Sequence, residues 1–358
     1  MLSLVLAVSM LSACTSSNHG KLRENLSWTL SDDGVLTISG EGEMSTLKSD
    51  DSFQYEKDRI ESVVIEEGVM SIGFRVFNNF EGLKSVIIPK SVSNIALDAF
   101  YGCTSLMNIK VDESNPNFSV DNSGVLFNKD KTLLLLAPKG LTGEYIIPDG
   151  VELVCEDAFK DCSLLKSITI PYSVTSISAG MFTNCISLES VTIPESVAEI
   201  EYEAFCGCTS LESVAIPDSV TRIGNGAFEY CTFLESIAIP DGVTEIKSFT
   251  FTDCTSLKSV TIPDGVTNID AAVFSGCTSR KSITIPDSVT RIGDVVFEGC
   301  SSLTSIMFKG DAPAISDSFS NVAVKAYYPA NNNTWKDIVE NVEQNGGNIT
   351  WVAYDSNS

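Results

Sequence analysis

Eleven cysteines and one histidine are the residues of this 358-residue chain whose types suit metal or redox chemistry. Eight of the cysteines share one register, seven of them exactly one repeat of 23 residues apart: Cys103, Cys162, Cys185, Cys208, Cys231, Cys254, Cys277 and Cys300. The single histidine, His19, and the absence of a Cys-x-x-Cys pair argue against zinc. We predict a column of free, buried thiols, although their spacing also leaves disulfide bonds between neighbouring repeats open. Cys155 and Cys206 stand outside the column and are expected to be more exposed.

Carboxylates form a second column in the same register, in which Tyr172 stands where the other repeats have an acid. Its members are Asp149, Glu195, Asp218, Asp241, Asp264 and Asp287. Stacked carboxylates could recruit a divalent cation. Asp after proline is also an ordinary turn residue, and we favour that interpretation. We therefore predict neither a metal nor a cofactor.

The chain offers little for catalysis. It has no glycine-rich phosphate loop and no Gly-x-Ser-x-Gly elbow, and His19 lies in a polar stretch near the N-terminus. A formal net charge of −24 with a pI near 4.3 argues against nucleic acid, whose phosphates require clustered Lys and Arg. The same charge opposes docking on an anionic lipid surface.

The elements that must position these residues come from the repeat itself. Proline and phenylalanine recur in the same 23-residue register, at Pro148, Pro171, Pro194, Pro217, Pro240, Pro263 and Pro286 and at Phe159, Phe182, Phe205, Phe228, Phe251, Phe274 and Phe297. Before each proline, apolar and small residues alternate, as Val214 and Ile216 do with Ser213 and Ala215, which is typical of a half-buried strand. One such unit cannot bury its apolar residues alone, whereas stacked units can.

The order Cys-x-x-Leu-x-x-Ile/Val-x-Ile-Pro-x-x-Val-x-x-Ile-x-x-x-Ala-Phe resembles the BspA-like, treponemal-type leucine-rich repeat of bacteria, over roughly Ile60 to Lys309. The resemblance implies a repeat solenoid, a right-handed coil with a parallel β-sheet on one face. It also implies a surface location and adhesion-type function. We predict a small β cap over 26–59, the repeat array over 60–310 and a small α/β cap over 311–358. Trp28, Tyr55, Trp335 and Trp351 are expected to cover the open ends rather than to stack on sugars.

The N-terminal residues resemble an export signal. Met1 to Leu11 is apolar, and Leu11-Ser12-Ala13-Cys14 resembles the bacterial lipobox, whose cysteine is lipidated. No Lys or Arg precedes the run, so an ordinary apolar leader is the alternative. We predict a lipoprotein-type signal over 1–14, a tether over 15–25, and membrane contact only through a lipid on Cys14.

Two departures from the repeat attract attention. Between Asp112 and Pro148 the step is 36 residues instead of 23, and Val125–Phe127 and Leu133–Leu136 read as a hairpin. This island, 113–147, either packs on the array or protrudes as a contact surface. Arg280 occupies a position filled by leucine in its neighbours, and we expect its side chain to reach solvent because an unpaired buried guanidinium is costly.

The outward positions of the strands carry Ser, Thr and Ala, without the Trp, Tyr or Arg that anchor most interfaces. We therefore expect tight contacts at rims and insertions, where the candidates are Asn128, Lys129, Lys131, Tyr172, Tyr202 and Arg280. The sequence favours an exported, non-catalytic, adhesin-like binding protein whose partner is an extracellular protein or glycan. A structural spacer on the envelope is the alternative, and an enzyme is a remote third.

Overall fold

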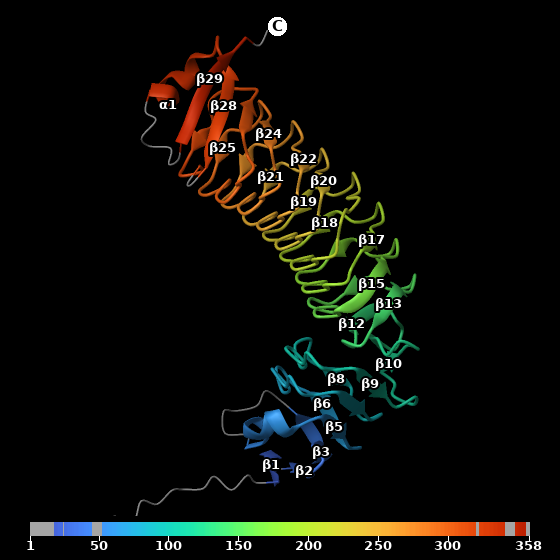
Figure 1. Ribbon diagram of the computed structural model, residues 1–358. Coiled ribbons are helices and arrows are strands. Elements are labelled where there is room, and N and C mark those ends of the chain that lie inside the picture. The colour runs from blue at the N-terminus through green and yellow to red at the C-terminus, as the bar shows by residue number, and fades with distance from the viewer. Residues whose placement is uncertain (1–17, 24, 45–51, 320–321, 341–347, 356–358) are drawn as a thin grey trace, which may run out of the picture.

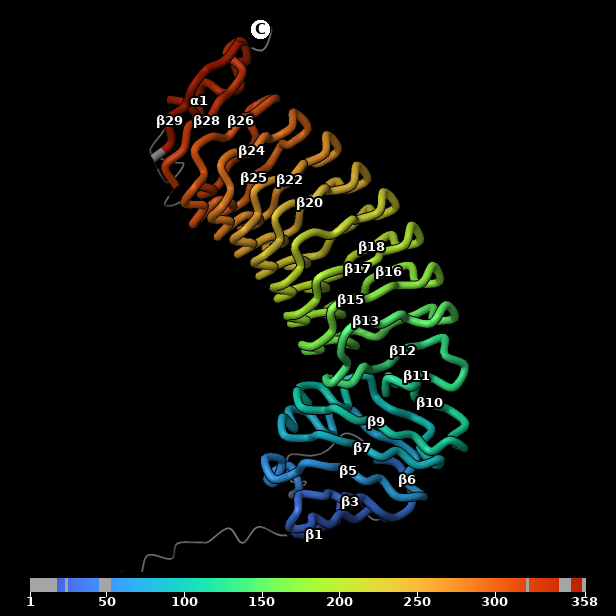
Figure 2. Tube along the Cα trace, turned by 45° about the vertical axis from the view of Figure 1, so that its right-hand side comes forward, coloured from blue at the N-terminus to red at the C-terminus, as the bar shows by residue number. Residues whose placement is uncertain are grey.

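The chain winds into an elongated, curved solenoid in which β1 and β29 lie at opposite ends (Figures 1 and 2). The computed structural model describes residues 18–23, 25–44, 52–319, 322–340 and 348–355. Successive turns lie side by side and contribute mostly parallel strands, so the predicted repeat solenoid is confirmed.

Each regular turn contributes a longer strand to one face. These strands are β5 (Ser62–Ile65), β7 (Ser85–Ile88), β9 (Asn108–Val111), β13 (Thr142–Ile146), β15 (Leu164–Thr169), β17 (Ser190–Thr192), β20 (Ser236–Ala238), β22 (Ser259–Thr261), β24 (Ser282–Ile285) and β26 (Ser305–Phe308). The row is split into separate sheets, and Ser213 joins it only through a single bridge to Ser236. In the regular turns the outward Ser, Thr and Ala side chains are exposed or half-buried, as predicted.

A second row of shorter strands follows the proline turns. It comprises β6 (Val69–Ile72), β8 (Asn94–Ile95), β14 (Leu153–Val154), β16 (Ser176–Ile177), β18 (Glu199–Ile200), β19 (Arg222–Ile223), β21 (Glu245–Ile246), β23 (Asn268–Ile269), β25 (Arg291–Ile292) and β27 (Ala314–Ile315). The isoleucine or valine of each pair points inward. The two rows therefore enclose one continuous apolar core.

After its short strand, each regular turn forms an irregular segment, here called the rim, that carries the phenylalanine of the repeat. In one such turn the amides of Asp157, Phe159 and Asp161 donate to the carbonyls of the next turn, at 3.1, 3.0 and 2.8 Å. The same three donors recur in each turn from Gly180 to Gly276. From Asp157 to Gly276 the rim is therefore a ladder of three bonds per turn, which replaces sheet pairing there. Before the island, the amides of Phe77 and Asn79 make two such bonds to the next turn, at 2.9 and 2.8 Å.

The core contains two regular columns. Successive phenylalanine rings stack face to face, as Phe205 and Phe228 do at 5.3 Å and 5°. Beside them, the column thiols donate to the carbonyl of a phenylalanine in the preceding turn, as Cys208 does to Phe182 at 3.2 Å, except that Cys162 donates to the Pro138 carbonyl at 3.6 Å. The ten described cysteines are free. Cys206 is half-buried, in line with the prediction, but the exposure predicted for Cys155 is wrong because it packs into the core at 4% exposure.

Caps close both ends. The N-terminal cap holds β1 (His19–Arg23), β2 (Leu26–Leu30), β3 (Val35–Gly40), β4 (Gly42–Met44) and the 3-10 helix η1 (Ser52–Arg59). Trp28 is buried there against Phe53, with ring centroids 6.0 Å apart. The C-terminal cap holds β28 (Ala323–Pro329), η2 (Asn333–Trp335), α1 (Lys336–Glu340) and β29 (Asn348–Tyr354), and its Trp335 packs on Phe308 at 4.8 Å. The capping role predicted for Tyr55 is wrong, because this side chain is 75% exposed.

Candidate functional site at the break in the array

The regular coil stops at the island, which lies between two stacks of turns (Figure 2). Its strands β10 (Phe118–Val120), β11 (Leu126–Asn128) and β12 (Leu133–Leu136) pair antiparallel, so the predicted hairpin is confirmed. β12 then joins β14 of the following turn in parallel. Among the strands that the structure describes, β9 pairs on the longer-strand face with β7 alone, and β13 pairs with β15 alone. The sheet is therefore divided at this point.

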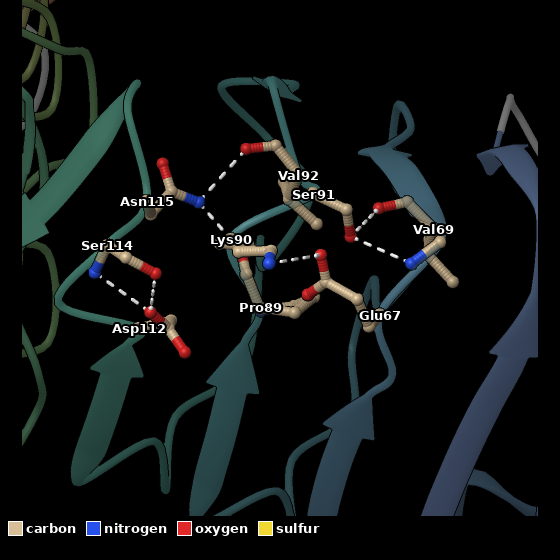
Figure 3. Close-up of polar contacts among 10 residues, drawn as sticks. Glu67, Val69, Pro89, Lys90, Ser91, Val92, Asp112, Ser114 and Asn115 are labelled. Atoms are coloured by element: carbon tan, nitrogen blue, oxygen red, sulfur yellow. Dashed lines mark hydrogen bonds and ion pairs between the residues drawn. The ribbon is translucent and has the colours of Figure 1, made fainter.

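A buried amide fixes the start of the island. Asn115 stands where other turns have a core valine, and its Nδ2 donates to the carbonyls of Pro89 and Val92 at 2.7 and 3.0 Å (Figure 3). Its Oδ1 accepts from the amides of Asn117 and Phe118 at 2.8 and 2.9 Å. In the regular turns a serine connects the proline turn to the preceding turn instead. The Oγ of Ser91, for example, donates to the Val69 carbonyl (Figure 3).

The phenylalanine column is interrupted at the island. The amide of Ala137 donates to the Ala158 carbonyl at 2.8 Å, as the Phe77 amide does to the Ala99 carbonyl, so alanine takes the place of a ring. Inside the core, the ring of Tyr145 packs on Phe159 at 5.8 Å and partly compensates. Burial and a hydrogen bond to Asp121 raise the pKa of Tyr145, which keeps its hydroxyl neutral.

A cavity of about 440 Å³ opens at the rim beside this interruption, and we call it the break cavity. Its lining comes from both stacks and from the end of the island: Phe74, Arg75, Ala96, Leu97, Asp98, Phe100, Tyr101, Gly102, Leu135, Leu136, Lys139, Glu156, Asp157, Lys160 and Asp161. Leu97, Phe74 and Tyr101 are exposed by 66%, 49% and 39%. Large exposed apolar and aromatic groups beside a hollow are typical of a binding site.

Two cations flank the ring of Tyr101 in this cavity. The Arg75 guanidinium lies 5.7 Å from the ring centroid, and the Lys160 ammonium lies 4.9 Å from it. Arg75 is paired with Asp98 at 3.0 Å and Lys160 with Asp157 at 3.4 Å. Burial nevertheless raises the pKa of Asp157. The two ion pairs thus position the cations against the ring of Tyr101.

Lys139 lies at the same site and is 8% exposed. Its ammonium donates to the carbonyl of Lys160, and its backbone amide donates to the Leu106 carbonyl at 2.7 Å. This residue therefore connects the two stacks across the break.

The predicted hairpin residues lie away from the break cavity. Asn128 closes the hairpin, since its side chain bonds Thr132 at 2.9 Å and the amide of Leu133 at 2.9 Å. Lys129 donates to the carbonyl of Glu113 at 3.2 Å. The ammonium of Lys131 lies 5.8 Å from the ring of Phe127. These contacts give the hairpin residues roles within the island.

The remaining candidates are dispersed. Tyr172 is 73% exposed in a proline turn, and Tyr202 is 54% exposed on the rim. Tyr202 lines a smaller hollow that shares Tyr101, Glu156, Asp157 and Lys160 with the break cavity. Its hydroxyl donates to Glu203, and this bond is the main cause that raises the pKa of Tyr202 to about 12.

The outward orientation predicted for Arg280 is wrong. The side chain is 1% exposed and occupies the leucine position of the core, where its Nε and Nη1 have no hydrogen-bond partner among the described residues. Contact with the Phe274 ring, at 5.0 Å, replaces solvation in part. The Arg280 amide donates to the Cys277 carbonyl at 3.2 Å, as the Leu257 amide does to the Cys254 carbonyl at 3.0 Å, so the backbone keeps the register that directs this side chain into the column.

The lipidation candidate Cys14 and the segment 1–14 lie outside the described residues. Within the described part of the chain, no group of three or more acidic, His or Cys side chains is arranged to hold a metal ion. No helix among the described residues is long and apolar enough to cross a membrane.

Sequence reasoning did not identify Phe74, Arg75, Tyr101 or Lys139 as a site. One signal was available: the phenylalanine column runs from Phe100 directly to Phe159, so the turn between them contributes no ring. Another was Asn115 in the valine column. The missing phenylalanine and the buried asparagine both belong to the turn that borders the break cavity.

Comparison with known proteins agrees with this architecture. A family model described as BspA type leucine-rich repeat region matches residues 48–123, 141–241 and 221–339. No curated protein is significantly similar in sequence.

Several solved structures are similar. A leucine-rich repeat protein from Eubacterium ventriosum is 24% identical over 79% of this chain and 95% of its own, with a TM-score of 0.48. A leucine-rich cell surface protein from Faecalibacterium prausnitzii is 26% identical over 94% of both chains, with a TM-score of 0.44. The leucine-rich repeat protein of T. pallidum is 29% identical over 54% of this chain and 89% of its own, with a TM-score of 0.46.

Proposed function

Since the chain belongs to the BspA-type leucine-rich repeat family, we propose that it is a cell-surface binding protein that contacts an extracellular protein through the break cavity. The observation that carries the proposal is the cavity itself, where exposed Leu97, Phe74 and Tyr101 adjoin Arg75 and Lys160. Aromatic and Arg side chains in a hollow are the groups that most often dominate binding energies.

The longer-strand face is a poorer candidate for the binding surface than the break cavity. Its regular middle exposes hydroxyl and methyl groups, such as those of Ser190, Thr192 and Ala238. Such a face offers no large anchor for a partner. Export with a lipid on Cys14 would place the chain on the envelope, and binding there is adhesin-like and needs no catalysis. An envelope spacer remains the second candidate, favoured by the uniformity of the second stack.

Binding of the chain to an array of purified extracellular proteins and glycans tests the proposal. We expect a protein ligand whose affinity falls at least about tenfold, or about 1.4 kcal/mol, in Tyr101→Ala and Leu97→Asp. Ser190→Glu with Ser236→Glu, on the longer-strand face, should leave the affinity within about twofold.

Three results would contradict the proposal: exclusive glycan binding, equal losses in the two sets of variants, or no ligand at all. The last result would favour the spacer.

A further inference from the structure

The rim ladder stops at the break cavity. Among the residues that the structure describes, none accepts a hydrogen bond from the amides of Asp98, Phe100 or Gly102. These residues correspond to Asp157, Phe159 and Asp161 of the second stack, whose amides all donate to the next turn. Asp98, Phe100 and Gly102 also line the break cavity. Three amide donors, at every second residue, therefore border the break cavity.

The island explains why no chain reaches these donors. The turn that follows Gly102 leaves the repeat at Asn115, and the backbone returns to the rim only through Leu134–Lys139. The shorter-strand row resumes first, where the amides of Glu152 and Leu153 donate to the Thr132 carbonyl. At the rim, the amide of Ala137 continues the ladder forward to Ala158, and that of Lys139 donates back to Leu106. Leu106 lies beyond the three rim donors, so the ladder resumes without using them.

We propose that the break cavity binds an extended polypeptide segment of a partner protein, whose alternate carbonyls accept from the amides of Asp98, Phe100 and Gly102. The segment takes the place that the following rim turn has elsewhere in the array. These backbone hydrogen bonds fix the register of the bound segment, as in the addition of a strand to a sheet edge. One apolar side chain of the segment contacts Leu97, Phe100 and Leu136, which form the apolar wall.

The charged groups of the cavity determine which charges are favourable beside the apolar residue of that segment. Arg75 and Lys160 are already paired with Asp98 and Asp157. Glu156 and Asp161 also line the cavity and form no ion pair among the described residues, while the ammonium of Lys139 donates to the Lys160 carbonyl. The lining thus carries four carboxylates and three cations. A segment with a Lys or Arg beside its apolar residue is therefore preferred over an acidic one.

This inference rests on the proposed function and specifies its ligand. The chain itself supplies a probe: a blocked peptide of residues 178–184, Ser-Ala-Gly-Met-Phe-Thr-Asn, whose carbonyls at Ala179, Met181 and Thr183 accept the rim amides of the preceding turn. The control peptide carries thioamides at these three positions, which are weaker acceptors of the same shape. Hydrogen exchange of single amides in the full chain is followed by NMR.

Without peptide, the amides of Asp98, Phe100 and Gly102 should exchange much faster than those of Asp157, Phe159 and Asp161. Saturating peptide should slow the first three at least about tenfold and leave the second three unchanged. The thioamide peptide should bind at least about fivefold more weakly. Leu97→Asp should abolish the protection, whereas Leu153→Asp, a matched change at an exposed leucine outside the cavity, should not.

Four outcomes would overturn the inference: slow exchange at the three amides without peptide, binding that leaves them unprotected, equal effects of the two aspartate variants, or sedimentation showing that a second copy of the chain occupies the cavity. If a protein partner binds through Tyr101 without protecting these amides, the proposed function stands and only the inference fails.

Discussion

The guanidinium carbon of Arg280 lies 5.0 Å from the ring centroid of Phe274, inside a column that leucines fill in the neighbouring turns. Burial lowers the pKa of Arg280, and two of its nitrogens lack a partner. Arg280→Leu should therefore raise the free energy of unfolding, by roughly 1–4 kcal/mol. Urea unfolding followed by circular dichroism measures the change.

The control for this change is Lys281→Leu, which removes the same charge at an exposed position. Its stability should change by less than about 0.5 kcal/mol. A lower urea midpoint for Arg280→Leu would show that the guanidinium has a stabilising partner.

Asn115 makes four hydrogen bonds while fully buried. Asn115→Leu would leave the carbonyls of Pro89 and Val92 without these donors, at a cost of about 2–4 kcal/mol. Hydrogen exchange in β10 and β11 should accelerate in parallel, because this amide fixes the start of the island. Asn122→Ala, at an exposed position of the same island, should alter neither quantity.

The thiol column makes the fold sensitive to alkali. Burial raises the pKa of Cys162 to about 11 and that of Cys103 to about 12, whereas an unfolded thiol has a pKa near 8.5. The unfolded chain therefore loses its protons first as the pH rises. Stability should be constant with respect to these thiols below about pH 8, and should fall from about pH 8.5 until the folded thiols ionise too.

Each such thiol contributes a slope of about 1.4 kcal/mol per pH unit in that window. Urea midpoints between pH 7 and pH 10 give the slope, and Cys162→Ala should reduce it by one thiol. A stability that is flat to pH 10 would show that the thiols are not buried in protonated form.

Val295 has a φ of +50°, in a rim position that Gly180 and Gly226 fill in other turns. A β-branched residue in the left-handed region is strained by about 1–2 kcal/mol. Val295→Gly should therefore stabilise the chain by up to about 1 kcal/mol, once the entropy of glycine in the unfolded state is included. The reciprocal Gly226→Val should destabilise it by about 1–2 kcal/mol, and thermal unfolding compares the two.

The regular part of the fold could be predicted because each turn makes the same contacts with its neighbours through equivalent residues. The spacing of Phe205 and Phe228 by one repeat length is enough to place their rings in contact. The hairpin of the island was also predictable, since apolar runs flank Asn128 to Lys131. Those features depend on neighbours in sequence or one turn away.

The break cavity could not be predicted in the same way. Its position depends on which island residue resumes the phenylalanine column, and the non-repeating sequence does not show that Ala137 does so. The leucine position of Arg280 was clear too, but the cost of an unpaired guanidinium predicted an outward side chain, and the backbone register directs it inward. The cavity therefore arises from packing between segments whose register the repeat no longer sets, whereas the orientation of Arg280 follows a register that the repeat does set, against the cost of burying a charge.

The divided sheet between β9 and β13 also affects how the chain bears load. A pull between the two caps passes through stacked rings and two rows of strands in each stack. At the island it passes through the short β12–β14 pair and through contacts such as those of Lys139 and Asn115. The solenoid should therefore extend first at this joint, while both stacks keep their coil. A partner bound across the joint would resist that extension.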